Sequence, residues 1–302
     1  FAGVLQEQGY RTAMVGKWHQ GFSMKAPGVF DYGRPLTGGP VDCGFDSFFG
    51  MHASLDIPPY FYIKDRTPIM PPTGRVVAST SVGGNEDWNK IQGAFWRAGD
   101  VAPDFKHAEV TPRFAAEAVK VIESHDGDKP LFLYLALPSP HTPWLPTPEF
   151  TGKSGAGMYG DFVMQVDSVV GKVMRALKQA GMSEKSLVIF SSDNGPVWYD
   201  KDTARFGHRS CGPLRGIKGS AWEGGHRMPF IARWPDRVPA GKTTSHTIAF
   251  SDILATFAEV AGKRKLPQGA AEDSVSFLPV LLHPGRRHKP RSPILHGAKV
   301  IR

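Results

Sequence analysis

Two short segments carry polar residues of the types that hydrolytic sites use. In Gly16-Lys17-Trp18-His19, a lysine and a histidine lie two positions apart. Residues two apart in an extended chain point to the same side, so the ammonium and the imidazole can face one anionic group. The alternative is a surface lysine beside a packed histidine. In Asp193-Asn194-Gly195, a carboxylate and an amide oxygen offer the ligands that calcium prefers, although Asn-Gly is also a strong turn signal.

Two further candidates lie in loops of special composition. His141 stands among the prolines of Pro138-Ser139-Pro140-His141-Thr142-Pro143, which we expect to hold its ring in one place. Lys218 lies in the glycine-rich stretch Gly212–Gly219, where backbone and ammonium can approach an oxyanion closely. An ordinary loop histidine and a flexible surface loop are the respective alternatives.

These polar segments follow or adjoin stretches that we expect to form an α/β fold. The unbroken apolar run Leu131 to Leu137 predicts a strand buried on both faces. Catalytic groups commonly sit where strands of open α/β sheets end. We predict a mostly parallel sheet flanked by helices. The expected strands are 10–15, 131–137, 187–190 and 229–234, and the expected helices are 1–8, 111–124 (capped by Thr111), 159–180 and 251–260.

Residues 22–110 have a different texture, rich in glycine, proline and aromatic residues with weak periodicity. We predict a loop-dominated rim that selects the substrate, with Asp56 and Trp88 as substrate-binding residues and Tyr60 and Tyr62 as further ring-stacking candidates. Packing within the rim is the alternative for all four. We expect residues 1–302 to form one catalytic domain, with 265–302 beginning a C-terminal subdomain.

The composition of the chain limits the kinds of partner that it is expected to bind. A net charge of +8 favours anionic partners, and the spacing shows neither a zinc finger nor an aromatic-basic RNA signature, so we expect no nucleic acid. The basic clusters 263–265 and 286–291 are interpreted as solvated surface. No run of about 18 apolar residues predicts a membrane span. Cys43 and Cys211 are either free thiols or one bridge, and no oligomeric state follows from the sequence.

The amino-acid sequences of several segments, and the order of these segments, resemble the sulfatase family, a branch of the alkaline-phosphatase superfamily. The resemblance spans almost the whole chain and implies an alkaline-phosphatase-like fold. The matching segments are Gly9 to His19, Cys43 to Gly50, Pro138 to Pro143, Ser192 to Gly195, Gly212 to Gly219, Glu223 to Pro229 and Ser251 to Leu254, and the stretch Ala53 to Tyr60 resembles bacterial sulfatases of polysaccharide breakdown.

The resemblance implies roles for individual residues. Asp193 and Asn194 would be Ca²⁺ ligands, Lys17 and His19 would contact the nucleophile, and His141 with Lys218 would hold the sulfate and the departing oxygen. The family nucleophile is a formylglycine made from a cysteine in a Cys-x-Pro-Ser-Arg segment nearer the N-terminus than this chain begins. By the same resemblance we expect a periplasmic or secreted protein.

The sequence therefore predicts a sulfuric ester hydrolase acting on a sulfated carbohydrate or an aryl sulfate. A phosphomonoester or phosphonate hydrolase, and an inactive relative that binds sulfated glycans, are the alternatives. The chain opens within an expected helix and ends abruptly at Arg302, so we expect a fragment truncated at both ends and inactive by itself. Cys211-Gly212-Pro213-Leu214-Arg215 matches the maturation motif only minimally, and we interpret that match as chance.

Overall fold

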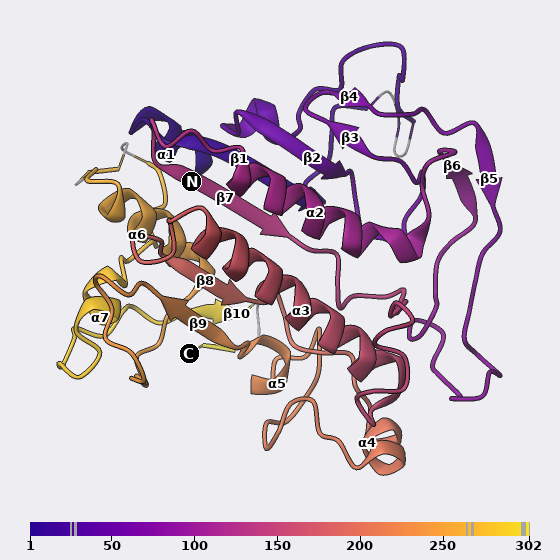
Figure 1. Ribbon diagram of the computed structural model, residues 1–302. Coiled ribbons are helices and arrows are strands. Elements are labelled where there is room, and N and C mark those ends of the chain that lie inside the picture. Colours follow the sequence, from indigo (N-terminus) through magenta and orange to yellow (C-terminus); the bar gives the residue numbers. More distant parts are fainter. Residues whose placement is uncertain (25, 27–28, 264, 267–268, 297–299, 302) are drawn as a thin grey trace. The chain divides into compact units, whose positions relative to one another are not determined.

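The computed structural model describes residues 1–301 except 25, 27–28, 264, 267–268 and 297–299. The chain divides into two compact units (Figure 1): an N-terminal unit, Ala2–Ala180, and a C-terminal unit, Gly181–Arg302 together with Phe1. Phe1 joins the C-terminal unit through an edge-on contact with Phe257, with ring centroids 6.1 Å apart.

A mixed sheet forms the centre of the N-terminal unit, with the strand order β4-β3-β2-β1-β7. Its strands are β1 (Arg11–Lys17), β2 (Ser47–Met51), β3 (Ile63–Lys64), β4 (Thr67–Pro68) and β7 (Leu131–Ala136). β1 pairs in parallel with both β2 and β7, whereas β3 and β4 add antiparallel pairs at one edge. The α/β class predicted from the sequence is confirmed, and the antiparallel edge makes the sheet mixed.

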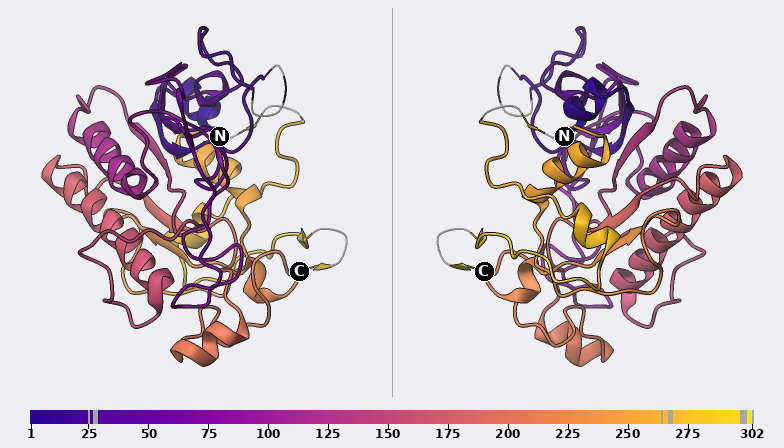
Figure 2. Two further views of the ribbon diagram at one scale, coloured as in Figure 1. Left: turned by 90° about the vertical axis from the view of Figure 1, so that its right-hand side faces the viewer. Right: turned by 90° about the vertical axis from the view of Figure 1, so that its left-hand side faces the viewer.

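Helix α2 (Val110–Glu123) covers this sheet, α3 (Gly157–Gln179) packs on α2, and the short α1 (Ala2–Glu7) precedes β1. α2 lies against β1, β2 and β7, and α3 runs alongside α2 (Figures 1 and 2). Phe114, Ala118 and Ile122 are spaced by four residues along α2 and are buried, as expected for an amphipathic helix on a sheet. Thr111 does not cap α2, because the helix begins one residue earlier and the Thr111 hydroxyl lies 2.5 Å from that of Ser139.

The apolar strand β7 is less buried than its sequence predicts. Five of its residues are half-buried, and Tyr134 is 42% exposed. The expectation of a strand buried on both faces is wrong for this structure. The physical reason is position, because β7 is an edge strand of the described sheet and only one of its sides is paired.

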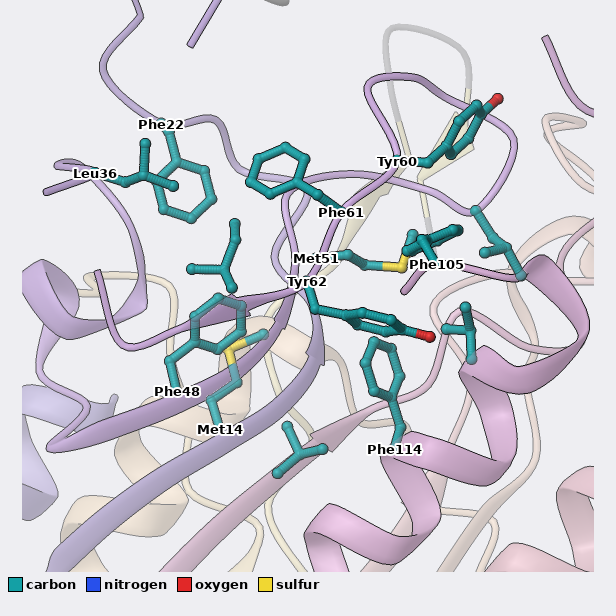
Figure 3. Packing of buried hydrophobic residues seen from close by; sticks show 14 of the residues in the cluster. Met14, Phe22, Leu36, Phe48, Met51, Tyr60, Phe61, Tyr62, Phe105 and Phe114 are labelled. Carbon is teal, nitrogen blue, oxygen red and sulfur yellow. The ribbon is translucent and has the colours of Figure 1, made fainter. Parts of the chain in front are cut away.

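The segment predicted as a loop-dominated rim supplies much of the hydrophobic core. Phe61, Tyr62 and Ile63 are fully buried, and Figure 3 shows Tyr62 beside Phe114 of α2. Their rings meet edge-on with centroids 6.2 Å apart. Glycine and proline content predicted irregular backbone here but did not reveal burial. The regular elements between residues 22 and 110, besides β2 to β4, are η1 (Pro40–Cys43), β5 (Gly74–Val76), β6 (Gly99–Val101) and η2 (His107–Glu109).

The C-terminal unit contains short elements around the antiparallel pair of β8 (Val188–Ser191) and β9 (Phe230–Arg233). No helix in the described part of the chain combines the length and apolar character needed to cross a membrane. The remaining elements are α4 (Asp200–Phe206), α5 (Glu223–His226), η3 (Phe250–Asp252), α6 (Ile253–Val260), α7 (Leu278–Leu282), β10 (Leu295–His296) and β11 (Val300–Ile301).

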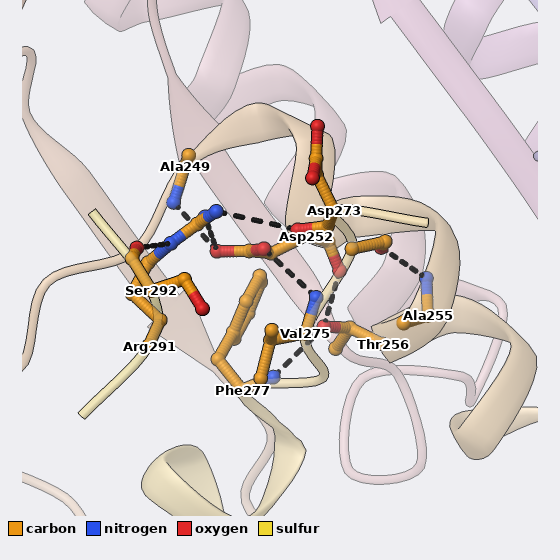
Figure 4. A network of polar contacts seen from close by, with 10 residues as sticks. Ala249, Asp252, Ala255, Thr256, Asp273, Val275, Phe277, Arg291 and Ser292 are labelled. Atoms are coloured by element: carbon orange, nitrogen blue, oxygen red, sulfur yellow. Dashed lines mark hydrogen bonds and ion pairs between the residues drawn. The ribbon is translucent and has the colours of Figure 1, made fainter. Parts of the chain in front are cut away.

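A buried ion pair organises this unit (Figure 4). Asp252 accepts hydrogen bonds from the amides of Ala249 and Val275, and the guanidinium of Arg291 lies 2.5 Å from its carboxylate. The side chains of Arg291 and Asp252 are 7% and 2% exposed. Arg291 is therefore not part of a solvated basic surface as predicted, although Arg286 and Arg287 are exposed. Removing one partner would leave the other charge buried without compensation.

His107 is a neutral histidine inside the aromatic part of the N-terminal unit. Its ring stacks on Trp96 with centroids 4.6 Å apart and meets Tyr60 edge-on at 4.5 Å. Burial lowers the pKa of His107 to about 4. Its Nε2 atom is buried without a hydrogen-bond partner among the described residues.

His107→Phe is expected to reduce the loss of stability on acidification. In the unfolded chain a histidine titrates near pH 6.5, so between pH 6.5 and 4 the unfolded state binds more protons and the folded state loses stability as pH falls. For this side chain the loss is about 2 kcal/mol between pH 7.5 and 5. Denaturant unfolding at both pH values should show the variant losing that much less than the wild type. Equal losses would contradict the buried neutral state.

Candidate active site

Strand ends in the N-terminal unit meet at glycine residues. Gly16 of β1 is in register with Gly50 of β2 and Ala136 of β7. Gly16 has φ +128°, and a Cβ there would lie 2.0 Å from the carbonyl oxygen of Ala136. A Cβ at Gly50 would lie 1.8 Å from the carbonyl oxygen of Gly16. Only glycine fits at these two positions. The close approach brings together the carboxyl ends of the parallel strands β1, β2 and β7, and Lys17 and the loop of His141 lie at these ends.

Lys17 and His19 follow this meeting point. Lys17 is the last residue of β1 and is half-buried, and His19 is exposed. Beyond the end of β1, the amides of Trp18 and His19 donate to the carbonyls of Met51 and His52, each at 3.0 Å. His19 has φ 55°, so the chain leaves the extended conformation there. The strand alternation expected to align Lys17 with His19 therefore does not hold at His19.

His52 is a second imidazole at this place, and sequence reasoning missed it. Its side chain is 9% exposed, and its Nε2 atom lies 2.9 Å from the carbonyl oxygen of Pro59. Burial lowers the pKa of His52 to about 4; the charge of His19 acts in the same direction, and the hydrogen bond to Pro59 opposes it. His52 is thus neutral at neutral pH and adds no positive charge beside His19. The only signal for His52 in the sequence was its position eight residues before the aromatic segment that begins at Tyr60.

His141 lies in the loop that follows β7. The loop is tied down by Trp144, whose indole N–H donates to the carbonyl of Pro140 at 2.9 Å. The Nδ1 atom of His141 lies 2.8 Å from the carbonyl oxygen of Thr142 and 3.3 Å from the hydroxyl of Ser54. Because a carbonyl oxygen only accepts, Nδ1 carries the proton of the neutral ring. Nε2 is then the nitrogen at which a proton can be accepted or delivered.

Residues 52–54 contact two of the three N-terminal candidates, His19 and His141. The carbonyl of His52 accepts the amide of His19, and the hydroxyl of Ser54, two residues on, contacts His141. The structure therefore brings His19 and His141 to residues 52–54, and Lys17 is in register with the preceding residue, Met51. Ser54 was not singled out in advance, although a hydroxyl two positions before Asp56 was a readable signal.

The two predicted substrate-binding residues are both buried. Asp56 is 5% exposed, forms an ion pair with Arg97, and lies 3.8 Å from His141 (Oδ1 to Nδ1). Trp88 is 2% exposed and meets Trp144 edge-on, with centroids 4.9 Å apart. Its indole N–H donates to Glu86 at 2.6 Å. Neither side chain has an exposed surface that could contact a sugar, because both are buried and form internal contacts. Tyr60 and Tyr62 are buried as well.

In the C-terminal unit, Asp193 and Asn194 follow directly after β8. Asp193 is exposed, and Asn194 is half-buried. The Ser192 hydroxyl donates to the carbonyl of Asn194 at 3.1 Å, and the Asn194 side-chain amide donates to the carbonyl of Gly195 at 2.9 Å. This second bond uses the nitrogen end of the amide. Its oxygen end is therefore the one that can ligate a cation.

Lys218 is held beside this pair by a crossing of backbone segments. The Lys218 amide donates to the carbonyl of Pro196, and the Gly195 amide donates to the carbonyl of Gly225, both at 2.9 Å. A Cβ at Gly195 would lie 1.8 Å from the carbonyl oxygen of Gly224. This contact requires glycine at 195, whereas a Cβ at Gly224 or Gly225 would meet the carbonyl oxygens of Gly216 or Ser220, at 2.3 and 2.4 Å. Lys218, Asp193 and Asn194 thus belong to one local arrangement.

The oxygen pair fits calcium in ligand type but supplies only part of a ligand set. Calcium takes roughly six to eight oxygen ligands, and carboxylate and amide oxygens are among those it prefers. Across the described residues, no group of three or more His, Cys, Asp or Glu side chains is arranged to hold a metal ion. Asp193 and Asn194 are consequently a partial site. Whether the N-terminal and C-terminal groups of residues converge on one anion stays a prediction.

Both cysteines are free thiols, which settles the choice left open by the sequence. Cys43 is exposed, whereas Cys211 is half-buried with its sulfur 3.6 Å from the carbonyl oxygen of Gly224. Burial raises the pKa of the Cys211 thiol. A reactive cysteine requires the opposite shift, so the environment of Cys211 is that of a packed thiol.

Gly195→Ala is expected to destabilise the C-terminal unit by about 2 kcal/mol or more, because the new methyl group overlaps the backbone of Gly224. Gly171→Ala on α3 is the matched control: its Cβ would come no closer than 3.4 Å to the flexible Arg175 side chain. Alanine in a helix should leave stability unchanged or raise it by about 0.5 to 1 kcal/mol. Thermal unfolding separates the two, and equal melting temperatures would refute the crossing.

Comparison with known proteins identifies the family. The Sulfatase family model matches residues 1–263. N-acetylgalactosamine-6-O-sulfatase of Bacteroides thetaiotaomicron is 34% identical over 93% of this chain and 60% of its own length. Human arylsulfatase A is 33% identical over 94% of this chain and 51% of its own length. The chain therefore spans between half and three fifths of the length of these relatives.

A solved structure agrees with the sequence comparison. A sulfatase structure from a study of glycosaminoglycan metabolism in Bacteroides thetaiotaomicron superimposes with a TM-score of 0.81 and 31% identity, covering 97% of this chain and 65% of that one. Family model, relatives and fold agree over nearly the whole chain. The chain belongs to the sulfatase family.

Proposed function

We propose that the protein containing this chain hydrolyses sulfate esters of carbohydrates. The observation that carries the proposal is the crossing at Gly195, which holds an ammonium-bearing loop beside an oxygen pair suited to calcium. A sulfate ester needs positive charge around its oxygens as the bond to sulfur breaks. Membership of the sulfatase family supports the same reaction.

Lys17 and Lys218 are assigned the binding of the sulfate oxygens. Their ammonium groups offset negative charge that accumulates in the transition state, the kind of electrostatic contribution that usually dominates such catalysis. Asp193 and Asn194 are the proposed calcium ligands of this chain. Bound calcium would supply further positive charge at the sulfate and the nucleophile.

His141 and His19 are assigned the proton transfers. His141 delivers a proton from Nε2 to the departing ester oxygen, and Nδ1 keeps its own proton, which it donates to the carbonyl of Thr142 at 2.8 Å. Lys218 is the second candidate for this proton. His19 accepts a proton from the nucleophile when sulfate is released. The family nucleophile, formylglycine, would supply the attacking hydroxyl from a segment that precedes this chain.

A sulfated carbohydrate is the proposed substrate class. One relative is by name an N-acetylgalactosamine-6-O-sulfatase, and the formal charge of +8 on this chain suits a polyanionic substrate. Membership of the sulfatase family also supports an exported location, periplasmic or secreted.

Lys218→Ala and His141→Ala are each expected to lower kcat for a sugar sulfate at least a hundredfold in the full-length protein, because each removes charge or a proton donor from the transition state. Released sulfate is the quantity to measure. Lys242→Ala and His283→Ala are the matched controls, since both side chains are exposed and belong to no proposed part of the site. Ordinary turnover by Lys218→Ala and His141→Ala would refute the assignment.

Removal of calcium is expected to abolish sulfate release, and calcium addition to restore it. Asp193→Ala should raise the calcium concentration needed for half-maximal activity, because it removes a charged ligand. Calorimetric titration of calcium gives a readout besides turnover. Unchanged calcium affinity in Asp193→Ala would contradict the proposed ligand. Phosphate and phosphonate esters serve as competing substrates, and preferential cleavage of either would favour those activities.

A further inference from the structure

Asp56 is a buried carboxylate with one oxygen unaccounted for. Oδ2 forms an ion pair with Arg97, whereas Oδ1 has no hydrogen-bond partner among the described residues. The side chain is 7% exposed. A buried carboxylate oxygen without a hydrogen bond is costly to keep. The nearest charge-bearing group described for Oδ1 is the imidazole of His141, at 3.8 Å.

The contact is made by the nitrogen that does not deliver the proton. Nδ1 of His141 faces the carbonyl of Thr142, the hydroxyl of Ser54 and Oδ1 of Asp56. All three are oxygen atoms that can accept from an N–H or attract its positive charge. The Nδ1 side of the ring is thus anchored, and Nε2 is the other end.

Arg97 holds the carboxylate of Asp56 in place without neutralising the negative charge that faces His141. Its guanidinium pairs with Oδ2 and also donates to the main-chain carbonyl of Asp56 at 3.2 Å. The hydroxyl of Tyr60 lies 3.1 Å from the same carbonyl and donates to that of Arg97 at 2.7 Å. The Arg97 side chain is 53% exposed, so water and salt screen its charge, while the carboxylate facing His141 is shielded from both.

We propose that Asp56, clamped by Arg97, is the positioning residue that holds His141 as the Nδ1–H form and stabilises its imidazolium. This inference rests on the proposed function and deepens it. As the oxygen of the nucleophile bonds to sulfur and the bond between sulfur and the ester oxygen breaks, the electron pair stays on the ester oxygen, which takes the Nε2 proton and leaves as the alcohol. His141 becomes neutral, keeps its Nδ1 proton, and is reprotonated at Nε2 by the proton that the nucleophile gives up to the solvent through His19.

The same contacts disfavour a direct sugar-binding role for Asp56. A side chain that is 7% exposed and paired with Arg97 has no surface to offer a hydroxyl group. Proton delivery also gives this role a distinct signature. A sugar oxygen needs a proton to leave, whereas a nitrophenolate leaves readily without one.

The test compares Asp56→Asn with the wild type on two substrates, galactose 6-sulfate and 4-nitrophenyl sulfate, in the full-length protein. Asparagine keeps the shape and removes the charge. We expect kcat for the sugar sulfate to fall about thirtyfold to a hundredfold with KM nearly unchanged, and kcat for the aryl sulfate to fall less than threefold. His141→Ala should show the same selectivity, and the double variant should be no worse than His141→Ala alone.

Asp104→Asn is the matched control. Asp104 likewise pairs with an arginine, Arg113, at 3.1 Å and has a buried oxygen without a partner among the described residues. It should change both substrates less than twofold. Arg97→Gln gives an independent variant should Asp56→Asn fail to fold, and the same preference for the aryl substrate is expected of it.

Equal losses on both substrates would make Asp56 merely structural, and a change confined to KM would make it a substrate ligand; either result overturns the proposal. A wild-type protein that cleaves neither sulfate would instead refute the proposed function, and the positioning role would fall with it. Wild-type turnover of both substrates with unchanged Asp56→Asn kinetics would overturn the positioning role alone.

Discussion

Close backbone contact at glycine is the constraint on which both groups of candidate residues depend. In the N-terminal unit, Gly16 and Gly50 let three strand ends approach until no Cβ fits between them. In the C-terminal unit, Gly195 and Gly224 do the same for two loops. Each contact leaves a polar side chain one to three residues away, so the backbone fixes where the chemistry begins.

Charge is the second constraint, because a site for a sulfate gathers cations that repel one another. His19 and His52 are joined through the backbone, yet burial lowers the pKa of His52 to about 4 and keeps it neutral. Around His141 the structure does the opposite and supplies negative charge from Asp56. Neighbouring imidazoles in one unit thus have different environments, one desolvated and one beside a carboxylate, which suits different tasks.

The sequence predicted where chemistry follows a strand, because apolar runs mark strands and the next polar residues mark their ends. Lys17 and Asp193 were placed in this way, each at or just after a strand. Burial in the segment 22–110 was not predictable, since aromatic composition fits a rim as well as a core, and Trp88 is 2% exposed. The pairing of Asp252 with Arg291, 39 residues apart, likewise needed the fold.

Each unit organises its own share of the proposed chemistry. The imidazoles are oriented by contacts inside the N-terminal unit, whereas the proposed metal ligands and Lys218 are held by contacts inside the C-terminal unit. Proton transfer and metal binding depend on geometry at the scale of fractions of an ångström, which local contacts supply. A change to the clamp between Arg97 and Asp56 is therefore expected to act first on His141, through contacts that lie within the N-terminal unit.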